Sequence, residues 1–159
     1  MATGADALSR GAEGGAMRHD ASCFYCVKDQ RLSDLMIEVA PLEVSTLFLF
    51  REQSYRGRCL VAFRDHAREL FELDQGELGA YARDLARAAR AVQRAVSPDK
   101  INYGAFADKQ GHLHVHLVPK ASGGRSWGGM FDMMPEPRRL LSRDEYDELL
   151  GRLRAGLAP

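Results

Sequence analysis

The most constraining stretch of this chain is HLHVHLVPK at residues 112–120, where three histidines alternate with apolar residues. On a β-strand, alternate side chains share one face of the sheet and repeat about every 6.6–6.8 Å. The pattern therefore predicts a strand with three imidazoles on one face and with Leu113, Val115 and Leu117 on the other, packed against a core. Imidazoles can act as nucleophile, acid, base or metal ligand near neutral pH, so the histidine face is the candidate functional site.

Other strands are predicted where apolar residues run or alternate between turn residues. Because these strands are joined by short links and one long helix precedes the last two, we expect an antiparallel sheet in an α+β domain. Together with 112–119, the predicted strands cover residues 34–41, 44–52, 56–64 and 101–107.

Two helices are predicted from their capping residues. The longer helix covers residues 74–96, with Asp74 as N-cap and Glu77 completing a capping box. The C-terminal helix covers residues 142–157, with Ser142 and Glu145 in the same arrangement. One apolar stripe of the long helix is expected to form a single face, and its members are Leu78, Ala82, Leu85, Ala89, Val92 and Val96.

Composition argues against several classes of protein. The 159 residues suffice for one domain, which we place at 23–159 after a disordered, Gly- and Ala-rich leader at 1–22. The 22 basic and 22 acidic residues balance, so nucleic acid is not expected to be the main partner. No apolar run is long enough to span a membrane, and the leader lacks the apolar segment of a signal peptide, so we expect a cytoplasmic protein. The natural start is open between Met1 and Met17.

Three interpretations of the histidine face compete. The simplest is a polar sheet face that happens to be rich in histidine, although the chain has only five histidines in all. A cupin-like site would bind iron or manganese through two such histidines. It would also need a carboxylate four or five residues further on, where this chain has Lys120 and Ala121. The third interpretation is a family resemblance.

HLHVHLV matches, without departure, the His-φ-His-φ-His-φ-φ signature (φ, apolar) of the histidine triad family of nucleotide hydrolases and transferases. The chain resembles this family from about Cys23 to about Leu157, including GRCLVAFRDHARELFELDQGEL at residues 57–78. The resemblance implies a five-stranded antiparallel sheet in an α+β domain that pairs into a homodimer. It also implies nucleotide substrates with a leaving group on the α-phosphate, such as dinucleoside polyphosphates or nucleoside phosphoramidates.

By this resemblance, His114 is the nucleophile that attacks the α-phosphorus and forms a nucleotidyl-histidine, which water then hydrolyses. His116 matches the residue that contacts the phosphate oxygens. A backbone carbonyl is expected to accept the Nδ1 proton of His114 and so orient its ring. The alternative function is a zinc-stabilised nucleotide-binding module with little turnover, but an intact His114 favours the enzyme.

Cys23 and Cys26 form a Cys-x-x-Cys pair, which is ambiguous by itself. A redox pair would usually open a helix after a strand, which is not predicted here, and an unused pair of thiols is the simplest alternative. In the zinc-binding branch of the histidine triad family, a histidine after the third strand and the first histidine of the triad complete the ligand set. The matching residues here are His66 and His112, and two sulfurs with two imidazoles would suit a structural zinc site.

Three more residues match substrate-contacting positions of the family, although each could instead be an ordinary surface or loop residue. Glu52 resembles the acidic residue that binds the ribose hydroxyls, and Asn102 resembles one that faces the phosphate. Trp127 lies where family members close over the leaving group. Many members carry Gly-Gln-Ser or Gly-Gln-Thr before the triad, whereas this chain has ADKQG, in which Lys109 and Gln110 would substitute.

Overall fold

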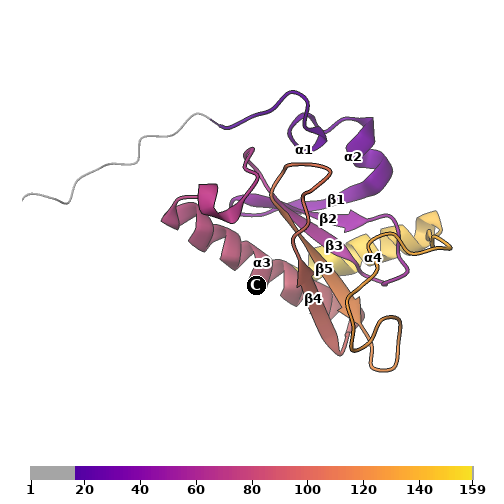
Figure 1. The fold of residues 1–159 in the computed structure, drawn as a ribbon. Helices are drawn as coiled ribbons and strands as arrows, with labels where there is room; N and C mark the ends of the chain where they lie inside the picture. Colours follow the sequence, from indigo (N-terminus) through magenta and orange to yellow (C-terminus); the bar gives the residue numbers. More distant parts are fainter. Residues whose placement is uncertain (1–16, 159) are drawn as a thin grey trace, which may run out of the picture.

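A computed structural model describes residues 17–158, which form one five-stranded antiparallel sheet with helices around it (Figure 1). The strand order is β1-β2-β3-β5-β4, so the histidine strand β5 lies inside the sheet, and β1 and β4 form its edges. The predicted α+β class is therefore confirmed. The strands are β1 Met36–Pro41, β2 Ser45–Phe50, β3 Cys59–Phe63, β4 Lys100–Gly104 and β5 His114–Lys120.

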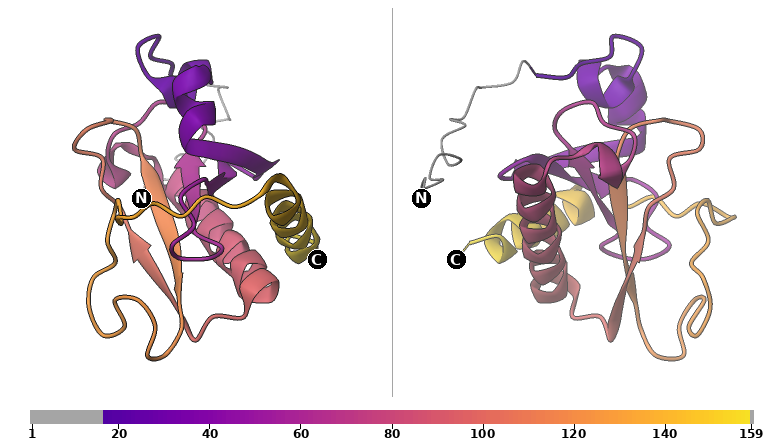
Figure 2. Two further views of the ribbon diagram at one scale, coloured as in Figure 1. Left: turned by 90° about the vertical axis from the view of Figure 1, so that its right-hand side faces the viewer. Right: turned by 60° about the vertical axis from the view of Figure 1, so that its left-hand side comes forward.

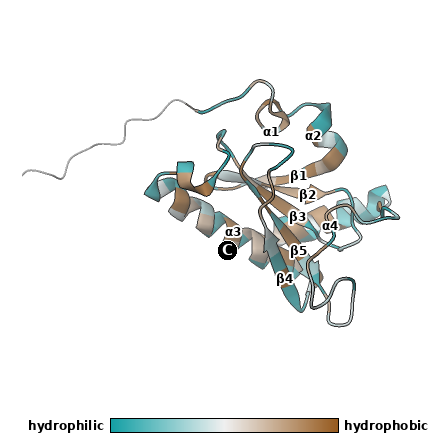
Figure 3. Ribbon diagram, in the orientation of Figure 1, coloured by the Kyte–Doolittle hydropathy of each residue, from teal (hydrophilic) through white to brown (hydrophobic). Residues whose placement is uncertain are grey.

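The main core lies between the sheet and two helices, α3 (Gln75–Val96) and α4 (Arg143–Gly156), which cover the same side of the sheet (Figure 2). As predicted, the apolar residues that alternate with the histidines belong to this core. Their side chains pack with those of α3 and α4, and the central strands are accordingly the most apolar part of the fold (Figure 3). Core members from β5, α3, α4 and the residue just before β5 include Leu113, Val115, Leu117, Tyr81, Val92, Leu149 and Leu153.

The opposite face of the sheet carries His114 and His116, and a smaller apolar cluster packs beside them. This cluster joins side chains of β1, β2 and β3 to the segment that begins at Cys23. Two short helices form that segment, α1 (Phe24–Val27) and α2 (Gln30–Leu35), and neither was predicted. At four and six residues they are too short for a periodic pattern to be read from sequence, and tertiary packing stabilises them.

Both capping boxes are present, at Asp74 for α3 and at Ser142 for α4. The stripe predicted for α3 is wrong over its first half, because Leu78 is 43% exposed and Ala82 is also exposed. The buried side there carries Tyr81, whose hydroxyl donates to a β3 carbonyl, and Asp84, which accepts from two amides of the turn between β1 and β2. In this alanine-rich helix, tertiary hydrogen bonds decide which face turns inward.

The predicted leader lies outside the described residues as far as residue 16. Residues 17–22 are placed and contact the domain: Arg18 forms an ion pair of 2.6 Å with Glu77, and the His66 amide donates to the Arg18 carbonyl. Between β3 and α3 the chain makes a single 3-10 turn, Leu70–Glu72. Within residues 17–158, no helix is both long enough and apolar enough to cross a membrane.

Candidate active site and metal centre

The three histidines of the motif are all buried, but they do not share one local structure. β5 begins at His114, two residues later than the motif alone predicts. His112 precedes the strand, in a turn where its amide donates to the Gln110 carbonyl. Within the sheet, His114 lies opposite Ala62 of β3 and His116 lies opposite Leu60. Both histidines therefore lie on an inner strand that pairs with another inner strand.

His114 is held in a defined tautomer. Its Nδ1 lies 2.7 Å from the carbonyl oxygen of His112, which can only accept a hydrogen bond, so Nδ1 carries the proton. Nε2 is thereby left with the lone pair. Burial lowers the pKa of His114, against the opposing effect of the His112 carbonyl, so the ring is neutral at pH 7. The ring is therefore in the form that a nitrogen nucleophile requires.

His116 has a different neighbour. Its Nδ1 lies 3.3 Å from Nη2 of Arg58, and the Arg58 guanidinium also lies over the Phe50 ring at 4.4 Å from its centroid. Burial, followed by the charge of Arg58, lowers the pKa of His116 to about 3. Sequence reasoning missed Arg58, because a charged residue beside a turn glycine normally points to solvent.

Cys23, Cys26, His66 and His112 form one cluster, as the resemblance implied. Their ligand atoms all lie within 4.8 Å of one another. Nδ1 of His112 lies 3.4 Å from Sγ of Cys23, and Nδ1 of His66 lies 3.4 Å from Sγ of Cys26. These four residues could hold a metal ion, and they come from α1, the loop after β3 and the turn before β5.

The outer contacts of this cluster suit a metal. His112 Nε2 donates to the Phe63 carbonyl at 2.8 Å, which turns the lone pair of its Nδ1 toward the sulfurs. His66 Nε2 lies 3.7 Å from a carboxylate oxygen of Asp20. Oxygen acceptors on the outer ring nitrogen are the usual support of metal-binding histidines. Burial also raises the pKa of Cys26, so a thiolate there calls for a cation.

A cavity of about 500 Å³ opens over His114 and His116. Phe24 and Tyr25, which lie between the two cysteines, supply part of its wall, as does Phe50 of β2. The Tyr25 ring stacks on His114 with the centroids 5.3 Å apart. The Cys-x-x-Cys segment therefore contributes directly to the pocket, which the motif spacing alone did not indicate.

A second cavity of about 380 Å³ also reaches His114 and is lined in part by Arg68 and Glu69. The loop 105–111 borders both cavities, with Phe106 and Asp108 lining each of them. The wall of the first cavity is mainly aromatic and apolar, with Asp108 and Lys109 on its loop side, whereas the second cavity adds Arg68 and Glu69 to Asp108. His114 thus lies where a bound molecule could place one part in each.

The residues expected to contact substrate are placed unequally. Gln110 and Lys109 line the apolar cavity together with His114. Asn102, on β4, lies opposite Val118 of β5 and is partly exposed. Its side chain is on the sheet face that carries His116.

Two of these residues lie away from the cavity. Glu52 is fully buried, and one of its oxygens accepts from the amides of Ser54 and Arg139, so the carboxylate is not offered to the cavity as a ribose ligand. Trp127 lies in an exposed loop after β5. The family resemblance assigned Glu52 and Trp127 to the substrate site from their positions along the chain. Position along the chain does not determine the direction of a side chain.

Comparison with known proteins agrees with this geometry. The HIT domain family model matches residues 38–123, more than half of the chain. No curated protein matches the sequence. A solved histidine triad protein from Bradyrhizobium japonicum has a TM-score of 0.74 at 21% identity, covering 82% of this chain and 96% of that one.

Two other solved structures are similar. A Zn-bound histidine triad family protein from Mycobacterium smegmatis has a TM-score of 0.61 at 24% identity, covering 86% of this chain and 93% of that one. A hypothetical histidine triad nucleotide-binding protein from Sulfolobus tokodaii has a TM-score of 0.64 at 22% identity, with coverage of 85% and 91%. At these identities the structures establish the fold, whereas the family model spans the histidine strand itself. The chain belongs to the histidine triad (HIT) family.

Proposed function

We propose that this protein cleaves nucleotides at the α-phosphate through a nucleotidyl-histidine formed on His114. The observation that carries the proposal is the tautomer of His114. Its Nδ1 proton is bound to the His112 carbonyl at 2.7 Å, and its ring borders a cavity of about 500 Å³. A neutral imidazole with a free lone pair beside an apolar pocket suits attack on a nucleotide whose base is held by aromatic walls.

The reaction proceeds in two displacements. Nε2 of His114 attacks the α-phosphorus, and the bond from phosphorus to the leaving group breaks, with its electron pair going to that group. Water then attacks the same phosphorus and releases one proton to solvent, the P–N bond breaks with its electron pair returning to Nε2, and His114 is restored as the nucleoside monophosphate leaves. His116 contacts the phosphate oxygens, and Asn102 and Gln110 are proposed to add polar contacts from the same side of the sheet.

The metal at Cys23, Cys26, His66 and His112 is proposed to be zinc in a structural role. Two thiolates and two imidazoles are ligands that zinc prefers, and four protein ligands leave no position for substrate. The relative from M. smegmatis is described as Zn-bound. When bound, zinc supplies a cross-link that ties α1 to the loop after β3 and to the start of the histidine strand.

The test is turnover of a panel of dinucleoside polyphosphates and nucleoside phosphoramidates in ¹⁸O-labelled water, with products and protein analysed by mass. We expect the label on the released nucleoside monophosphate and a nucleotidyl adduct on His114 after quenching at high pH, where the P–N bond survives. Label on the leaving group would contradict the mechanism. Turnover with no nucleotidyl adduct on His114 would contradict it as well.

The alternative, a zinc-stabilised nucleotide-binding module with little turnover, predicts a different result. Such a protein would bind nucleotide with the same pocket, but it would release no product and form no adduct in the same experiment. The ordered tautomer of His114 favours the enzyme, because a binding module has no need of a prepared lone pair.

We also propose a homodimer formed through α3 and the edge strand β4. Tyr103 of β4 is 56% exposed and Leu78 of α3 is 43% exposed, so both elements present apolar side chains to solvent. An open strand edge is usually paired or covered. Light scattering at micromolar concentration should give the mass of two chains, and a monomeric mass would contradict the proposal. Residence in the cytoplasm remains a prediction.

A further inference from the structure

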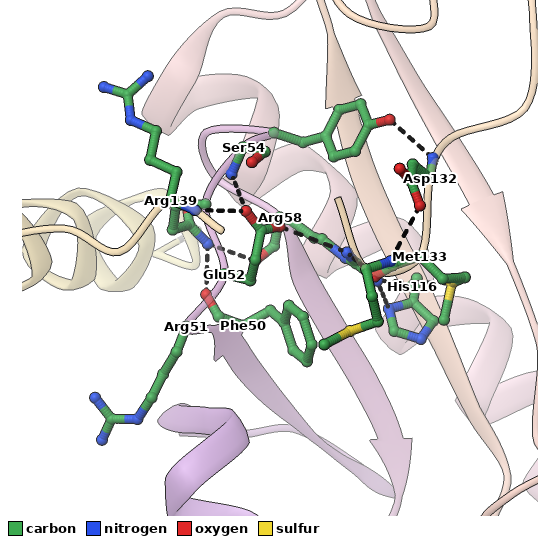
Figure 4. Close-up of polar contacts among 12 residues, drawn as sticks. Phe50, Arg51, Glu52, Ser54, Arg58, His116, Asp132, Met133 and Arg139 are labelled. Atoms are coloured by element: carbon green, nitrogen blue, oxygen red, sulfur yellow. Dashed lines mark hydrogen bonds and ion pairs between the residues drawn. The ribbon is translucent and has the colours of Figure 1, made fainter. Parts of the chain in front are cut away.

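Arg58 is a charged side chain beside the histidines that has no exposed surface. Its guanidinium donates through Nη1 to the Met133 carbonyl at 2.8 Å and lies with Nη2 at 3.3 Å from Nδ1 of His116 (Figure 4). Phe50 and Phe131 flank it, with ring centroids 4.4 and 5.7 Å away. An arginine held so tightly has little freedom to turn toward a ligand, so its effect must pass through the groups that it contacts.

We propose that Arg58 is a positioning residue that keeps the proton of His116 on Nε2. A guanidinium has only hydrogen-bond donors, so Nδ1 of His116 must be the acceptor in this contact. The neutral ring then presents an N–H at Nε2. His114 has the opposite arrangement, with the proton on Nδ1 and the lone pair on Nε2. Two adjacent imidazoles on one strand are thus prepared as a nucleophile and as a hydrogen-bond donor.

The consequence for catalysis rests on the proposed function. A donor at Nε2 of His116 can bind a phosphate oxygen as charge develops there, whereas a lone pair at that position would repel it. The two rings lie with their centroids 5.2 Å apart, so they can address the same phosphate group. Without Arg58, either ring nitrogen of His116 could carry the proton, and the donor would be present for only part of the time.

Glu52 supports Arg58 from behind. Its Oε2 lies 3.9 Å from Nη1 of Arg58, and both side chains are fully buried. Within residues 17–158, Oε2 of Glu52 and Nε of Arg58 have no hydrogen-bond partner. A buried guanidinium without a nearby negative charge would be costly, so Glu52 acts here as its counter-ion. This assignment accounts for the burial of Glu52 better than ribose binding does.

The same pair also holds the loop after β5. Arg58 binds the Met133 carbonyl, Glu52 accepts from the Arg139 amide at 3.2 Å, and the Gln53 amide donates to the Arg139 carbonyl at 2.7 Å. Met133 and Met134 line the apolar cavity. Loss of Arg58 could therefore disturb the pocket wall as well as His116, and the experiment must separate the two effects.

The test is two-bond ¹H–¹⁵N correlation spectroscopy of the ¹⁵N-histidine-labelled full chain at pH 8, where neutral tautomers are resolved. In the parent protein we expect His116 as a single Nε2–H tautomer with Nδ1 accepting a hydrogen bond, and His114 as the Nδ1–H tautomer. In Arg58→Met the two nitrogen shifts of His116 should change toward those of a ring in tautomeric exchange, while those of His114 stay unchanged. A protonated Nδ1 of His116 in the parent would overturn the proposal, even if no variant folded.

Kinetics supply the second readout. We expect Arg58→Met to lower kcat by about 10- to 100-fold, by analogy with the loss of outer partners that orient metal-binding histidines, with a smaller change in KM. Arg58→Lys retains a donor and should retain most of kcat. A purely structural disturbance of the Met133 wall would instead raise KM and affect both variants alike, and that result would overturn the proposal.

Arg56→Met is the matched control. Arg56 precedes Arg58 by two residues, but its side chain is exposed and its Nη1 lies 3.7 Å from Oε1 of Glu145 in α4. The substitution should therefore leave the spectrum of His116 and kcat unchanged. If the parent protein turned over no nucleotide, the proposed function would fail, while the spectra would still decide whether Arg58 sets the tautomer.

Discussion

The two ends of the histidine motif contrast in what surrounds them. At the first end, His112 faces two sulfurs and a second imidazole, and its outer nitrogen donates to a backbone carbonyl. At the other end, His116 accepts from the cation Arg58, which has a buried carboxylate behind it. The first environment attracts a cation and the second already contains one. A metal is therefore expected only at the first end.

His114 lies between these ends, and among residues 17–158 its ring makes a polar contact only with the backbone carbonyl of His112. The rings of His112 and His116 are held by residues distant in sequence, whereas the ring of His114 is held by the backbone two residues before it. The contrast teaches that the partner of one ring nitrogen sets the tautomer: His112 and His116 carry the proton on Nε2, whereas His114 carries it on Nδ1. The following experiments change each end in turn.

The largest effect is expected in the middle. His114→Ala should leave a folded protein that binds nucleotide but loses at least about 1,000-fold of its turnover, or about 4 kcal/mol of transition-state stabilisation, because the covalent route disappears. The ring is only 6% exposed and borders two cavities, so its removal enlarges an existing space rather than the core. Steady-state kinetics and nucleotide titration measure the two properties.

His114→Gly with free imidazole provides the positive control, because added imidazole can occupy the vacant place and restore part of the rate. Retention of more than about a thousandth of parental turnover by His114→Ala would show that covalent catalysis at this residue is wrong.

The next effect concerns the first end of the motif. Elemental analysis should find about one zinc per chain in the parent and almost none in Cys26→Ser, since a hydroxyl replaces a thiolate ligand. A loss of about 3 kcal/mol of stability would lower Tm by about 6–12 °C in a domain of this size. KM should rise as well, because Phe24 and Tyr25 between the cysteines line the pocket.

Cys59→Ala is the matched control for loss of a thiol. Cys59 is fully buried in the core of β3, away from the cluster, so its variant should keep its zinc. If the parent protein were metal-free, stable and active under chelation, the proposed zinc site at the first end of the motif would be wrong. His112 would then need another role.

A smaller effect is expected from pH at the second end. Unfolded His116 binds a proton below pH 6.5, whereas burial and Arg58 keep the folded residue neutral down to about pH 3. The unfolded state therefore binds more protons in this window, and the free energy of unfolding falls as pH is lowered, by up to about 1.4 kcal/mol per pH unit for this group. Denaturant unfolding from pH 7 to pH 4.5 measures the slope.

His116→Gln should reduce that slope by up to about one proton. The comparison is best made in the Cys26→Ser background, where release of metal does not add its own pH dependence. An unchanged slope in His116→Gln would mean that the ring is not held neutral.

The smallest effect is expected from Asp20, the outer partner of His66 at 3.7 Å. Asp20→Asn should weaken zinc binding by about tenfold or less, because the carboxylate is partly exposed and solvent can replace it. Competition with a coloured chelator measures the affinity, and turnover with zinc in excess should equal that of the parent. A loss of turnover at full zinc occupancy would show that the metal end reaches further into the chemistry than a structural site does.

Local pattern was sufficient for much of this fold. The period of two in HLHVHLV encodes the β5 strand and its buried apolar face, and Asp74 and Ser142 mark the starts of α3 and α4 through capping interactions. The cysteine pair and the first histidine could be assigned to one cluster because the family resemblance joins them. These features depend on residue type and spacing along the chain, which the sequence contains in full.

The sequence by itself therefore determined the α+β class, the strand, the caps and the types of side chain available for chemistry. Only the tertiary structure decided which side chains the rings of His112 and His116 contact. The partner of His112 lies 89 residues away at Cys23, and that of His116 lies 58 residues away at Arg58. The tertiary structure also buried Glu52, the expected ribose ligand, with its Oε2 3.9 Å from Nη1 of that arginine. The physical reason is that a ring nitrogen takes its proton state from the atom it meets in space.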